Sequence, residues 1–310
     1  MAGRIFMYDI IVVGGGPAGL TAALYAARAG KTAAVVEQGA PGGQIVNAPL
    51  VENYPALPRV SGVDFAEALL GQAEALGVEV LYEEALRAEK TADGFRLGTD
   101  AGEQECRALI LAPGVKHRAL GLPGEEELTG RGVSYCAVCD GAFYAGREVA
   151  IAGGGDTALQ DALFLADVCE KVTVLVRRDR FRGESTRARQ LAARSNVEIR
   201  FRRTVEAFDR TADGALAGLT LKNGETGSLE RLPVSGLFLA VGQEPNTAAF
   251  SGFVALDEAG YILSGEDTET SAPGVFAAGD ARTKTVRQLA TAVGDGAASA
   301  LAACRWLDRG

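Results

Sequence analysis

The chain has 310 residues, which at roughly 150 residues per domain corresponds to about two domains with separate cores. Hydrophobic residues make up 47% of it and charged residues 23%, values that exclude a disordered or collagen-like chain. With 31 Lys and Arg against 40 Asp and Glu, the formal net charge is −9, so the surface repels nucleic-acid phosphates and anionic lipids. We therefore expect a globular protein that binds neither nucleic acid nor membranes.

The cysteines and the single histidine limit the chemistry further. Five cysteines, an odd number, are not typical of a secreted disulfide framework. His117 is the only histidine, which excludes a site with several histidine ligands. Cys106, Cys169 and Cys304 stand in apolar or helical settings and are expected to be inert. No apolar run approaches about 18 residues, the length of a membrane-spanning helix. The apolar residues near the N-terminus are not followed by a small-residue cleavage site, as they would be in a signal peptide, so we expect a cytoplasmic protein.

The first predicted element is a strand over residues 9–13, followed by a glycine turn and a helix over residues 20–29. The turn motif consists of Gly14, Gly16, Pro17, Ala18 and Gly19. A second strand over residues 33–36 completes a βαβ unit, in which glycines permit a tight turn and the helix N-terminus faces a pyrophosphate. Glu37 follows this strand, 18 residues past Gly19, where a carboxylate accepts hydrogen bonds from ribose hydroxyls and repels a 2′-phosphate. The unit therefore favours the ADP half of FAD or NAD.

The next chemical signal is the pair Cys136 and Cys139, followed directly by Asp140. A structural zinc site needs four ligands, and the rest of the sequence supplies no second pair at a suitable spacing. A buried, inert pair is one alternative. A disulfide that opens to a dithiol is favoured, with a thiolate as nucleophile and Asp140 to manage its proton.

A second βαβ pattern begins 139 residues after the first. Residues 148–152 predict a strand, residues 159–168 a helix and residues 172–176 another strand. The turn between the first strand and the helix contains Gly153, Gly155, Asp156 and Thr157. Two dinucleotide sites are thus predicted, and close packing of helix on strand without any nucleotide is the alternative for each.

Arginines are concentrated after the second turn. Arg177 and Arg178 stand where the first unit has Glu37, and Arg182 follows one turn later. Guanidinium groups bind phosphate bidentately, so this site is predicted to take NADP. Residues 177–203 hold ten Arg and no Lys against three acidic residues, a local charge of +7. Its outer part is interpreted either as a solvated helix face or as a docking patch for an acidic protein partner.

Seven motifs, in this order along nearly the whole chain, resemble those of the low-molecular-weight, bacterial-type thioredoxin reductases. They are Gly-Gly-Gly-Pro-Ala-Gly at 14–19, Pro-Gly-Gly-Gln at 41–44, Val-Glu-Asn-Tyr-Pro at 51–55, Ser-Tyr-Cys-Ala-Val-Cys-Asp at 134–140, Gly-Gly-Gly-Asp-Thr-Ala at 153–158, Arg-Arg-Asp-x-Phe-Arg at 177–182, and Gly-Val-Phe-Ala-Ala-Gly-Asp at 274–280 with Arg-Gln at 287–288. The cysteine pair is the most specific element, because in the glutathione reductase branch the pair lies in the FAD domain.

The resemblance implies an α/β fold with two Rossmann-like dinucleotide-binding domains, the NADPH domain being inserted into the FAD domain. Residues 1–113 and 244–310 would form the discontinuous FAD domain, and residues 114–243 the NADPH domain that carries Cys136 and Cys139. A homodimer is implied as well. Pro113 departs from the Ala-Thr-Gly common in the family, and it removes a backbone donor at the expected crossover between the domains.

The resemblance also assigns residues to the cofactors. For FAD they are Gly14, Gly16, Pro17, Ala18, Gly19, Glu37, Gly43, Gln44, Asn53, Gly279, Asp280, Arg287 and Gln288. For NADPH they are Gly153, Gly155, Asp156, Thr157, Arg177, Arg178 and Arg182. Asp280 would accept from the ribityl chain, and it follows a strand predicted over residues 275–278, at whose carboxyl end ligands of α/β sheets collect.

The function implied by the resemblance is NADPH-dependent reduction of a protein disulfide, most of all that of thioredoxin, through FAD and Cys136–Cys139. Cys136, Cys139 and Asp140 are the expected catalytic residues, and no metal is expected. Two alternatives stay open: a dithiol oxidase on the same scaffold, and a redox sensor without catalysis.

Overall fold

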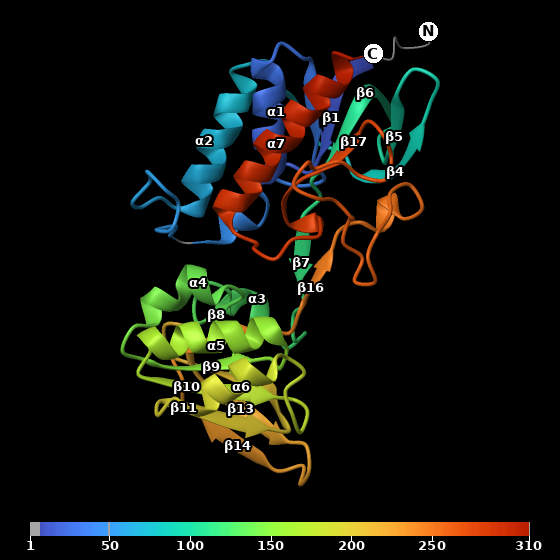
Figure 1. Cartoon of the computed structure of the whole chain (residues 1–310). Coiled ribbons are helices and arrows are strands. Elements are labelled where there is room, and N and C mark those ends of the chain that lie inside the picture. Colours follow the sequence, from blue (N-terminus) through green and yellow to red (C-terminus); the bar gives the residue numbers. More distant parts are fainter. Residues whose placement is uncertain (1–6, 49, 310) are drawn as a thin grey trace. The chain divides into compact units, whose positions relative to one another are not determined.

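The structure, a computed structural model, describes residues 7–48 and 50–309. The backbone divides into two compact units (Figure 1): unit 1 holds the chain up to Lys116 and from Glu244 onward, and unit 2 holds the chain from His117 to Gln243. The chain passes between the units twice, through β7 (Val115–His117) and β16 (Gln243–Pro245), which pair as a two-stranded sheet. Each unit combines strands with helices, which confirms the predicted α/β class.

Unit 1 is built on a seven-stranded sheet. Its strands are β1 (Met7–Val13), β2 (Ala33–Val36), β3 (Glu79–Leu81), β4 (Ala85–Lys90), β5 (Phe95–Thr99), β6 (Glu103–Leu111) and β17 (Val275–Ala277). β3, β2, β1 and β6 are parallel neighbours in that order, and β17 extends this parallel core beyond β6. The hairpin of β4 and β5 is antiparallel and pairs with the first half of β6.

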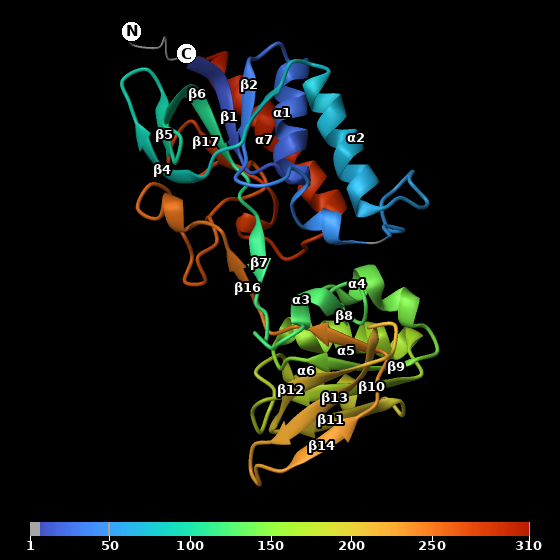
Figure 2. The same ribbon diagram turned by 180° about the vertical axis from the view of Figure 1, so that it is seen from behind.

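Three helices lie side by side on unit 1 in both views (Figures 1 and 2): α1 (Pro17–Arg28), α2 (Gly62–Glu74) and α7 (Leu289–Leu307). The second half of strand β1, from Ile10 to Val13, is apolar because both of its faces are buried there. Ile10 and Val12 belong to the core cluster shared with α1 and α7, whereas Ile11 and Val13 belong to the opposite cluster. This central strand ends at the first glycine turn and so fixes the turn against a rigid support.

Unit 2 repeats this arrangement with a five-stranded parallel sheet. Its strands are β8 (Val133–Ser134), β9 (Glu148–Ala152), β10 (Lys171–Val176), β11 (Val197–Phe201) and β15 (Gly236–Leu239), in the order β11-β10-β9-β15-β8. Val149 and Ile151 of β9 pack in one cluster with residues of α5 (Asp156–Val168). Ala150 and Ala152 face the opposite cluster, which includes an antiparallel sheet of β12 (Arg203–Arg210), β13 (Leu216–Asn223) and β14 (Leu229–Leu232).

Both nucleotide-turn helices begin three residues earlier than predicted. α1 begins at Pro17, since the fixed φ of proline and its missing N–H suit the first position of a helix. α5 begins at Asp156, directly after the glycine turn. An acidic residue in the first turn of a helix is favoured by the exposed backbone N–H groups there.

Short elements complete the chain: α3 (Glu125–Leu128), α4 (Ala137–Asp140), α6 (Ser185–Ala192), and the 3₁₀ turns η1 (Gly43–Asn47), η2 (Gly141–Tyr144), η3 (Ala248–Phe250) and η4 (Gly279–Ala281). Among residues 7–48 and 50–309, no helix combines the length and the apolar character needed to span a bilayer.

Candidate functional site

The first glycine turn brings β1 and α1 so close together that side chains do not fit between them. A Cβ added at Gly14, whose φ is +100°, would stand 2.2 Å from the carbonyl oxygen of Ala112. A Cβ at Gly19 would stand 1.8 Å from the carbonyl oxygen of Gly14. No described side chain caps α1 after Gly16, so its first N–H groups face outward from the turn and suit an anionic ligand.

Glu37 lies beside this turn, at the end of β2. Its Oε2 accepts a hydrogen bond of 2.7 Å from the N–H of Gly15, and its Oε1 accepts one of 2.9 Å from the N–H of Gly39. The two backbone donors fix the carboxylate next to the glycines. A phosphate placed here would meet this negative charge, whereas hydroxyl groups would find an acceptor.

Residues from distant parts of the sequence meet at the same turn. A Cβ at Gly43 of η1 would stand 3.1 Å from the Cα of Gly16. A Cβ at Gly279, whose φ is +73°, would stand 2.8 Å from the Cβ of Ala18. The amide of Gln44 donates to the carbonyl oxygen of Val115. The close approaches around Gly16 and Ala18 therefore form a cradle lined by backbone, in which a side chain at Gly43 or Gly279 would crowd its neighbours and strain the chain.

Asp280 follows β17 at this cradle and carries a free acceptor. Its Oδ1 is buried and has no hydrogen-bond partner among the described residues. Burial raises the pKa of Asp280, although the charges of Lys284 and Arg287 oppose the shift. A buried oxygen without a donor costs free energy, so this atom is suited to accept from a ligand hydroxyl.

Arg287, Gln288 and Asn53 lie at the start of α7. The guanidinium carbon of Arg287 stands 4.3 Å from the ring centroid of Tyr261, and its Nε donates to the carbonyl oxygen of Asp280 at 3.2 Å. Gln288 caps α7, and its Oε1 accepts from Nδ2 of Asn53 at 3.3 Å. Of these three predicted residues, Arg287 contacts the Asp280 turn, and Asn53 contacts Gln288 at the start of α7.

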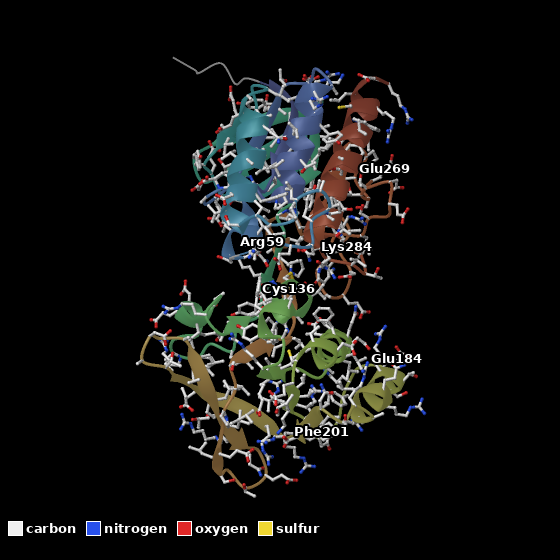
Figure 3. The ribbon with its side chains drawn as sticks, turned by 90° about the vertical axis from the view of Figure 1, so that its left-hand side faces the viewer. Arg59, Cys136, Glu184, Phe201, Glu269 and Lys284 are labelled. Atoms are coloured by element: carbon white, nitrogen blue, oxygen red, sulfur yellow. A yellow bond between two sulfur atoms is a disulfide. The ribbon has the colours of Figure 1, made fainter. Side chains whose placement is uncertain are left out.

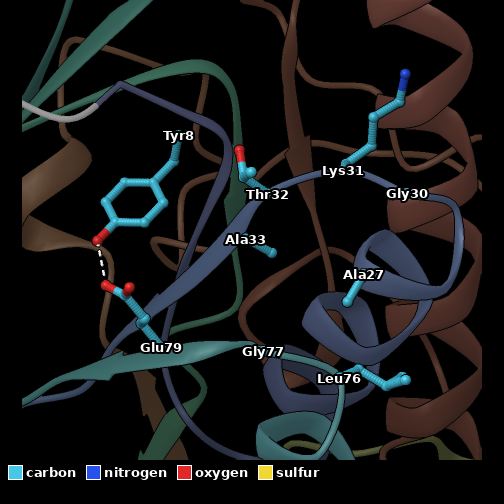
Figure 4. A pocket seen from close by; sticks show the side chains of 9 residues that line it. All are labelled: Tyr8, Ala27, Gly30, Lys31, Thr32, Ala33, Leu76, Gly77 and Glu79. Carbon is cyan, nitrogen blue, oxygen red and sulfur yellow. Dashed lines mark hydrogen bonds between the residues drawn. The ribbon is translucent and has the colours of Figure 1, made fainter.

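A pocket of about 650 Å³ lies elsewhere in unit 1 (Figure 4). It is lined by residues at the amino ends of β1 to β3, among them Tyr8 and Glu79, which share a hydrogen bond of 2.5 Å. The glycine turn stands at the carboxyl ends of the same strands, where ligands of parallel sheets bind. The pocket is therefore separate from the predicted nucleotide site.

The second glycine turn, in unit 2, is less crowded than the first. A Cβ at Gly153 would stand 2.5 Å from the carbonyl oxygen of Ala240. At the position equivalent to Gly19, however, the chain carries Ala158, whose side chain is accommodated in the core. Gly155 precedes α5, and no described side chain caps this helix.

The remaining turn residues lie at the first turn of α5. Oδ1 of Asp156 accepts from the N–H of Glu184 at 2.7 Å and stands 3.6 Å from the guanidinium of Arg187. Thr157 is exposed beside it. These contacts join the start of α5 to the segment that follows β10.

Arg177, Arg178 and Arg182 are exposed after β10, and none of them forms an ion pair with another described residue. The N–H of Arg182 donates to the carbonyl oxygen of Gly154 at 2.7 Å, which ties this segment to the glycine turn. Other arginines of the cluster are paired: Arg194 with Asp167, Arg200 with Glu198, and Arg203 with Glu230. Uncompensated positive charge is thus left beside the second turn.

Cys136 and Cys139 form a disulfide at the start of α4 (Figure 3, where Cys136 is labelled). The N–H of Cys139 also donates to Sγ of Cys136 at 3.3 Å. Two apolar side chains near the disulfide are exposed, Val138 at 41% and Phe143 at 37%. The other cysteines are buried and free, and burial raises the pKa of Cys106 to about 12.

Asp140 is held beside the disulfide by Ser134. Oγ of Ser134 donates to Oδ2 of Asp140 at 2.6 Å and accepts from the N–H of Cys136 at 3.1 Å. Burial raises the pKa of Asp140, and the hydrogen bond from Ser134 opposes that shift. Ser134 thus connects Asp140 to the backbone of Cys136. A carboxyl group with a raised pKa so close to a cysteine is suited to exchange a proton with a thiol. Ser134 belongs to the quoted cysteine motif but had been given no role.

Three further charged residues, Arg282, Lys284 and Asp295, had been assigned no role by the sequence. They form a buried ion cluster next to Asp280. No local sequence pattern predicts that Asp295 meets Arg282 and Lys284, because the cluster forms only when α7 packs against η4. Among residues 7–48 and 50–309, no three His, Cys, Asp or Glu side chains are grouped so that they could hold a metal ion.

Comparisons with known proteins agree with these features. The family described as "Pyridine nucleotide-disulphide oxidoreductase" matches residues 8–296. A thioredoxin reductase of Listeria monocytogenes is 42% identical over 300 residues, which cover 96% of this chain and 92% of the relative. A thioredoxin reductase of Bacillus subtilis is 37% identical, with 95% and 93% covered.

A solved structure of thioredoxin reductase from Streptococcus pyogenes has a TM-score of 0.94 at 38% identity and covers 99% of this chain and 100% of its own. The resemblance indicated by the sequence motifs is thereby confirmed. The chain belongs to the pyridine nucleotide-disulphide oxidoreductase family and, within it, to the thioredoxin reductases.

Proposed function

We propose that this protein reduces the disulfide of thioredoxin with electrons from NADPH, which pass through FAD and the Cys136–Cys139 pair. One observation carries the proposal: a disulfide with a half-buried, hydrogen-bonded Asp140 lies in the same unit as a glycine turn flanked by unpaired arginines. A redox pair, a proton-exchanging carboxyl group and a phosphate-binding turn are the parts that such a reductase requires.

FAD fits the first glycine turn. The cradle around Gly14 and Gly279 admits a pyrophosphate close to the backbone, and Glu37 offers an acceptor for ribose hydroxyls. The unpartnered Oδ1 of Asp280 offers an acceptor for a hydroxyl of the ribityl chain. When bound, the flavin supplies a two-electron relay between a nicotinamide and a disulfide.

NADPH fits the second glycine turn. The open N-terminus of α5 suits the pyrophosphate, and the unpaired guanidinium groups of Arg177, Arg178 and Arg182 suit a 2′-phosphate. An enzyme that used a small-molecule dithiol and oxygen would have no need of this positive charge. We therefore favour the reductase over the oxidase.

The reduced cysteine pair would perform the disulfide exchange. The thiolate of one cysteine attacks a sulfur of the partner disulfide, so that a mixed disulfide forms and the partner's other sulfur leaves as a thiolate. The second cysteine then attacks the mixed disulfide, which restores Cys136–Cys139 and releases the partner as a dithiol. Two protons must be delivered to the partner, and Asp140 is placed to hold or pass one of them. The overall reaction consumes NADPH, one proton and one disulfide.

The exposed Val138 and Phe143 next to the disulfide favour a protein over a small disulfide as substrate, since apolar surface of this kind is covered on docking. Relatives that are 37% to 42% identical are named thioredoxin reductase, which points to thioredoxin or a thioredoxin-like protein. We further propose a homodimer located in the cytoplasm.

The test is NADPH oxidation by the purified protein with thioredoxin as acceptor. We expect turnover that Cys136→Ser or Cys139→Ser abolishes, while NADPH still bleaches the flavin in either variant because hydride transfer needs no thiol. Cys169→Ala, which removes a buried thiol, is the matched control and should retain turnover. Oxygen uptake with a dithiol but no thioredoxin reduction would identify an oxidase instead, and absence of turnover with both would favour a sensor.

A further inference from the structure

Two cations and two carboxylates lie together beneath the Gly279–Asp280 turn, but they are not paired one to one. Asp295 of α7 is only 8% exposed and binds both cations. Its Oδ1 accepts from Nη2 of Arg282 at 2.7 Å, and its Oδ2 accepts from Nε of Arg282 and from Nζ of Lys284, each at 2.9 Å. Figure 3 labels Lys284 near the start of α7.

Asp280 receives none of these hydrogen bonds. Nζ of Lys284 stands 4.0 Å from Oδ1 of Asp280, too far for a hydrogen bond, and Oδ1 has no other partner among the described residues. Burial tends to raise the pKa of Asp295, but its bonds to Arg282 and Lys284 lower it overall. The pKa of Asp280 moves upward instead, since burial dominates there. The two cations therefore stabilise the carboxylate of Asp295 and leave Oδ1 of Asp280 without a hydrogen-bond donor.

Asp295 also holds the turn itself. Its Oδ2 accepts from the N–H of Gly279 at 3.0 Å, so the residue directly before Asp280 is bonded to the same carboxylate as the two cations. Gly279 has a φ of +73°, a left-handed conformation that glycine adopts readily. The bond to Asp295 stabilises this conformation and so fixes the position of the next residue, Asp280. One side chain thus controls both the backbone and the charges around Asp280.

We propose that Asp295 is a positioning residue for the cofactor site: by holding Arg282, Lys284 and the Gly279 N–H, it keeps Oδ1 of Asp280 free to accept from a hydroxyl of the flavin dinucleotide. This inference rests on the proposed use of FAD. Without the Asp295 carboxylate, the buried ammonium of Lys284 needs another partner, and the nearest one is Asp280. An ion pair there would occupy the oxygen that the ligand requires.

The experiment uses the full-length protein purified with its flavin, diluted serially while the fluorescence of released flavin is measured. Asp295→Asn keeps the side-chain shape but removes the charge that holds Lys284. We expect its dissociation constant for FAD to rise at least tenfold. Adding Lys284→Met to the same chain removes the competitor for Asp280, and we expect the constant to return to within about threefold of the wild type.

Two single variants complete the design. Lys284→Met alone should leave flavin retention unchanged, because in this proposal Lys284 does not contact the flavin. Glu125→Gln alters another buried carboxylate, one that accepts backbone N–H groups in unit 2, and should lower the melting temperature without releasing flavin.

The outcomes separate this inference from the proposed function. A wild-type protein that binds no flavin would overturn both. A flavin-bound wild type whose Asp295→Asn variant holds FAD equally well would overturn the inference alone. So would a loss in Asp295→Asn that Lys284→Met fails to restore, since Asp295 would then act only as a structural support. If Asp295→Asn does not fold, Lys284→Met decides: a tenfold loss of flavin retention in that variant overturns the inference, and unchanged retention supports it.

Discussion

The two glycine turns of this chain begin from the same pattern and end in opposite chemistry. Each follows a buried parallel strand and precedes a helix without a side-chain cap. The first is bounded by Glu37, whose carboxylate is fixed by two backbone N–H groups, and the second by arginines without ion-pair partners in the described chain. The fold thus supplies the same backbone frame twice. We expect the side chains after the second strand of each unit to determine which ribose the frame accepts.

The largest expected difference between the two turns comes from exchanging Gly and Ala at the equivalent positions 19 and 158. In Gly19→Ala the new Cβ meets the Gly14 carbonyl oxygen at 1.8 Å, a clash between the new side chain and the backbone that we expect to cost about 3 kcal/mol and most of the bound flavin. Ala158→Gly removes one methyl group from a helix and should cost about 1 kcal/mol. Thermal unfolding and flavin content measure both. Equal losses would show that the two turns are packed alike.

The choice of nucleotide gives the next effect. Arg177→Ala with Arg178→Ala removes two unpaired guanidinium groups, and each charged contact is worth roughly 1.5 to 3 kcal/mol. We expect the KM for NADPH to rise at least tenfold, with a much smaller change for NADH. Arg194→Ala, which breaks an ion pair with Asp167, is the control and should leave the preference unchanged. Equal use of NADH and NADPH by the wild type would contradict the assignment of the second turn.

The smallest expected effect concerns the two turn helices. Asp161 of α5 stands where α1 has the fully buried Ala22, and burial raises the pKa of Asp161 from 3.8 to about 6. A carboxyl group whose pKa is higher in the folded state contributes stability at low pH that is lost as pH rises through about 6.

Asp161→Ala should therefore gain stability relative to the wild type as pH rises from about 4 to about 6, by about 1 kcal/mol because the side chain is partly solvated. Melting temperatures at several pH values measure the difference between the two proteins. A difference that does not change with pH would exclude titration of Asp161 as its cause.

Local patterns predicted the parts of the site that depend on neighbours in sequence. The glycine spacing, the strand before Glu37 and the Cys136–Cys139 pair are each contained in a few consecutive residues, and the structure has the strand and the disulfide where they were expected. The two helices expected after the glycine turns are likewise found, as α1 and α5. Such features can be predicted because one turn or one strand determines them.

Other features depend on tertiary contacts and could not be predicted. Asp295 meets Arg282 and Lys284 only because α7 lies against the Gly279 turn. The bond from Ser134 to Asp140 requires the loop after β8 to return on itself. The antiparallel strands β4–β5 and β12–β14 were not predicted. They are added to a parallel core, and their pairing depends on which surfaces they cover rather than on a local pattern.

The three buried free cysteines make the protein its own internal standard for thiol labelling. With a pKa of about 12 for Cys106 and about 11 for Cys169, and a raised pKa for Cys304, these thiols stay protonated at neutral pH and closed to reagents. An alkylating reagent added to the folded protein should therefore find no thiol when Cys136 and Cys139 are oxidised, and two when they are reduced. The mass of the labelled chain would then count the electrons stored in the active pair directly, without a mutant and without a spectroscopic signal from the cofactor.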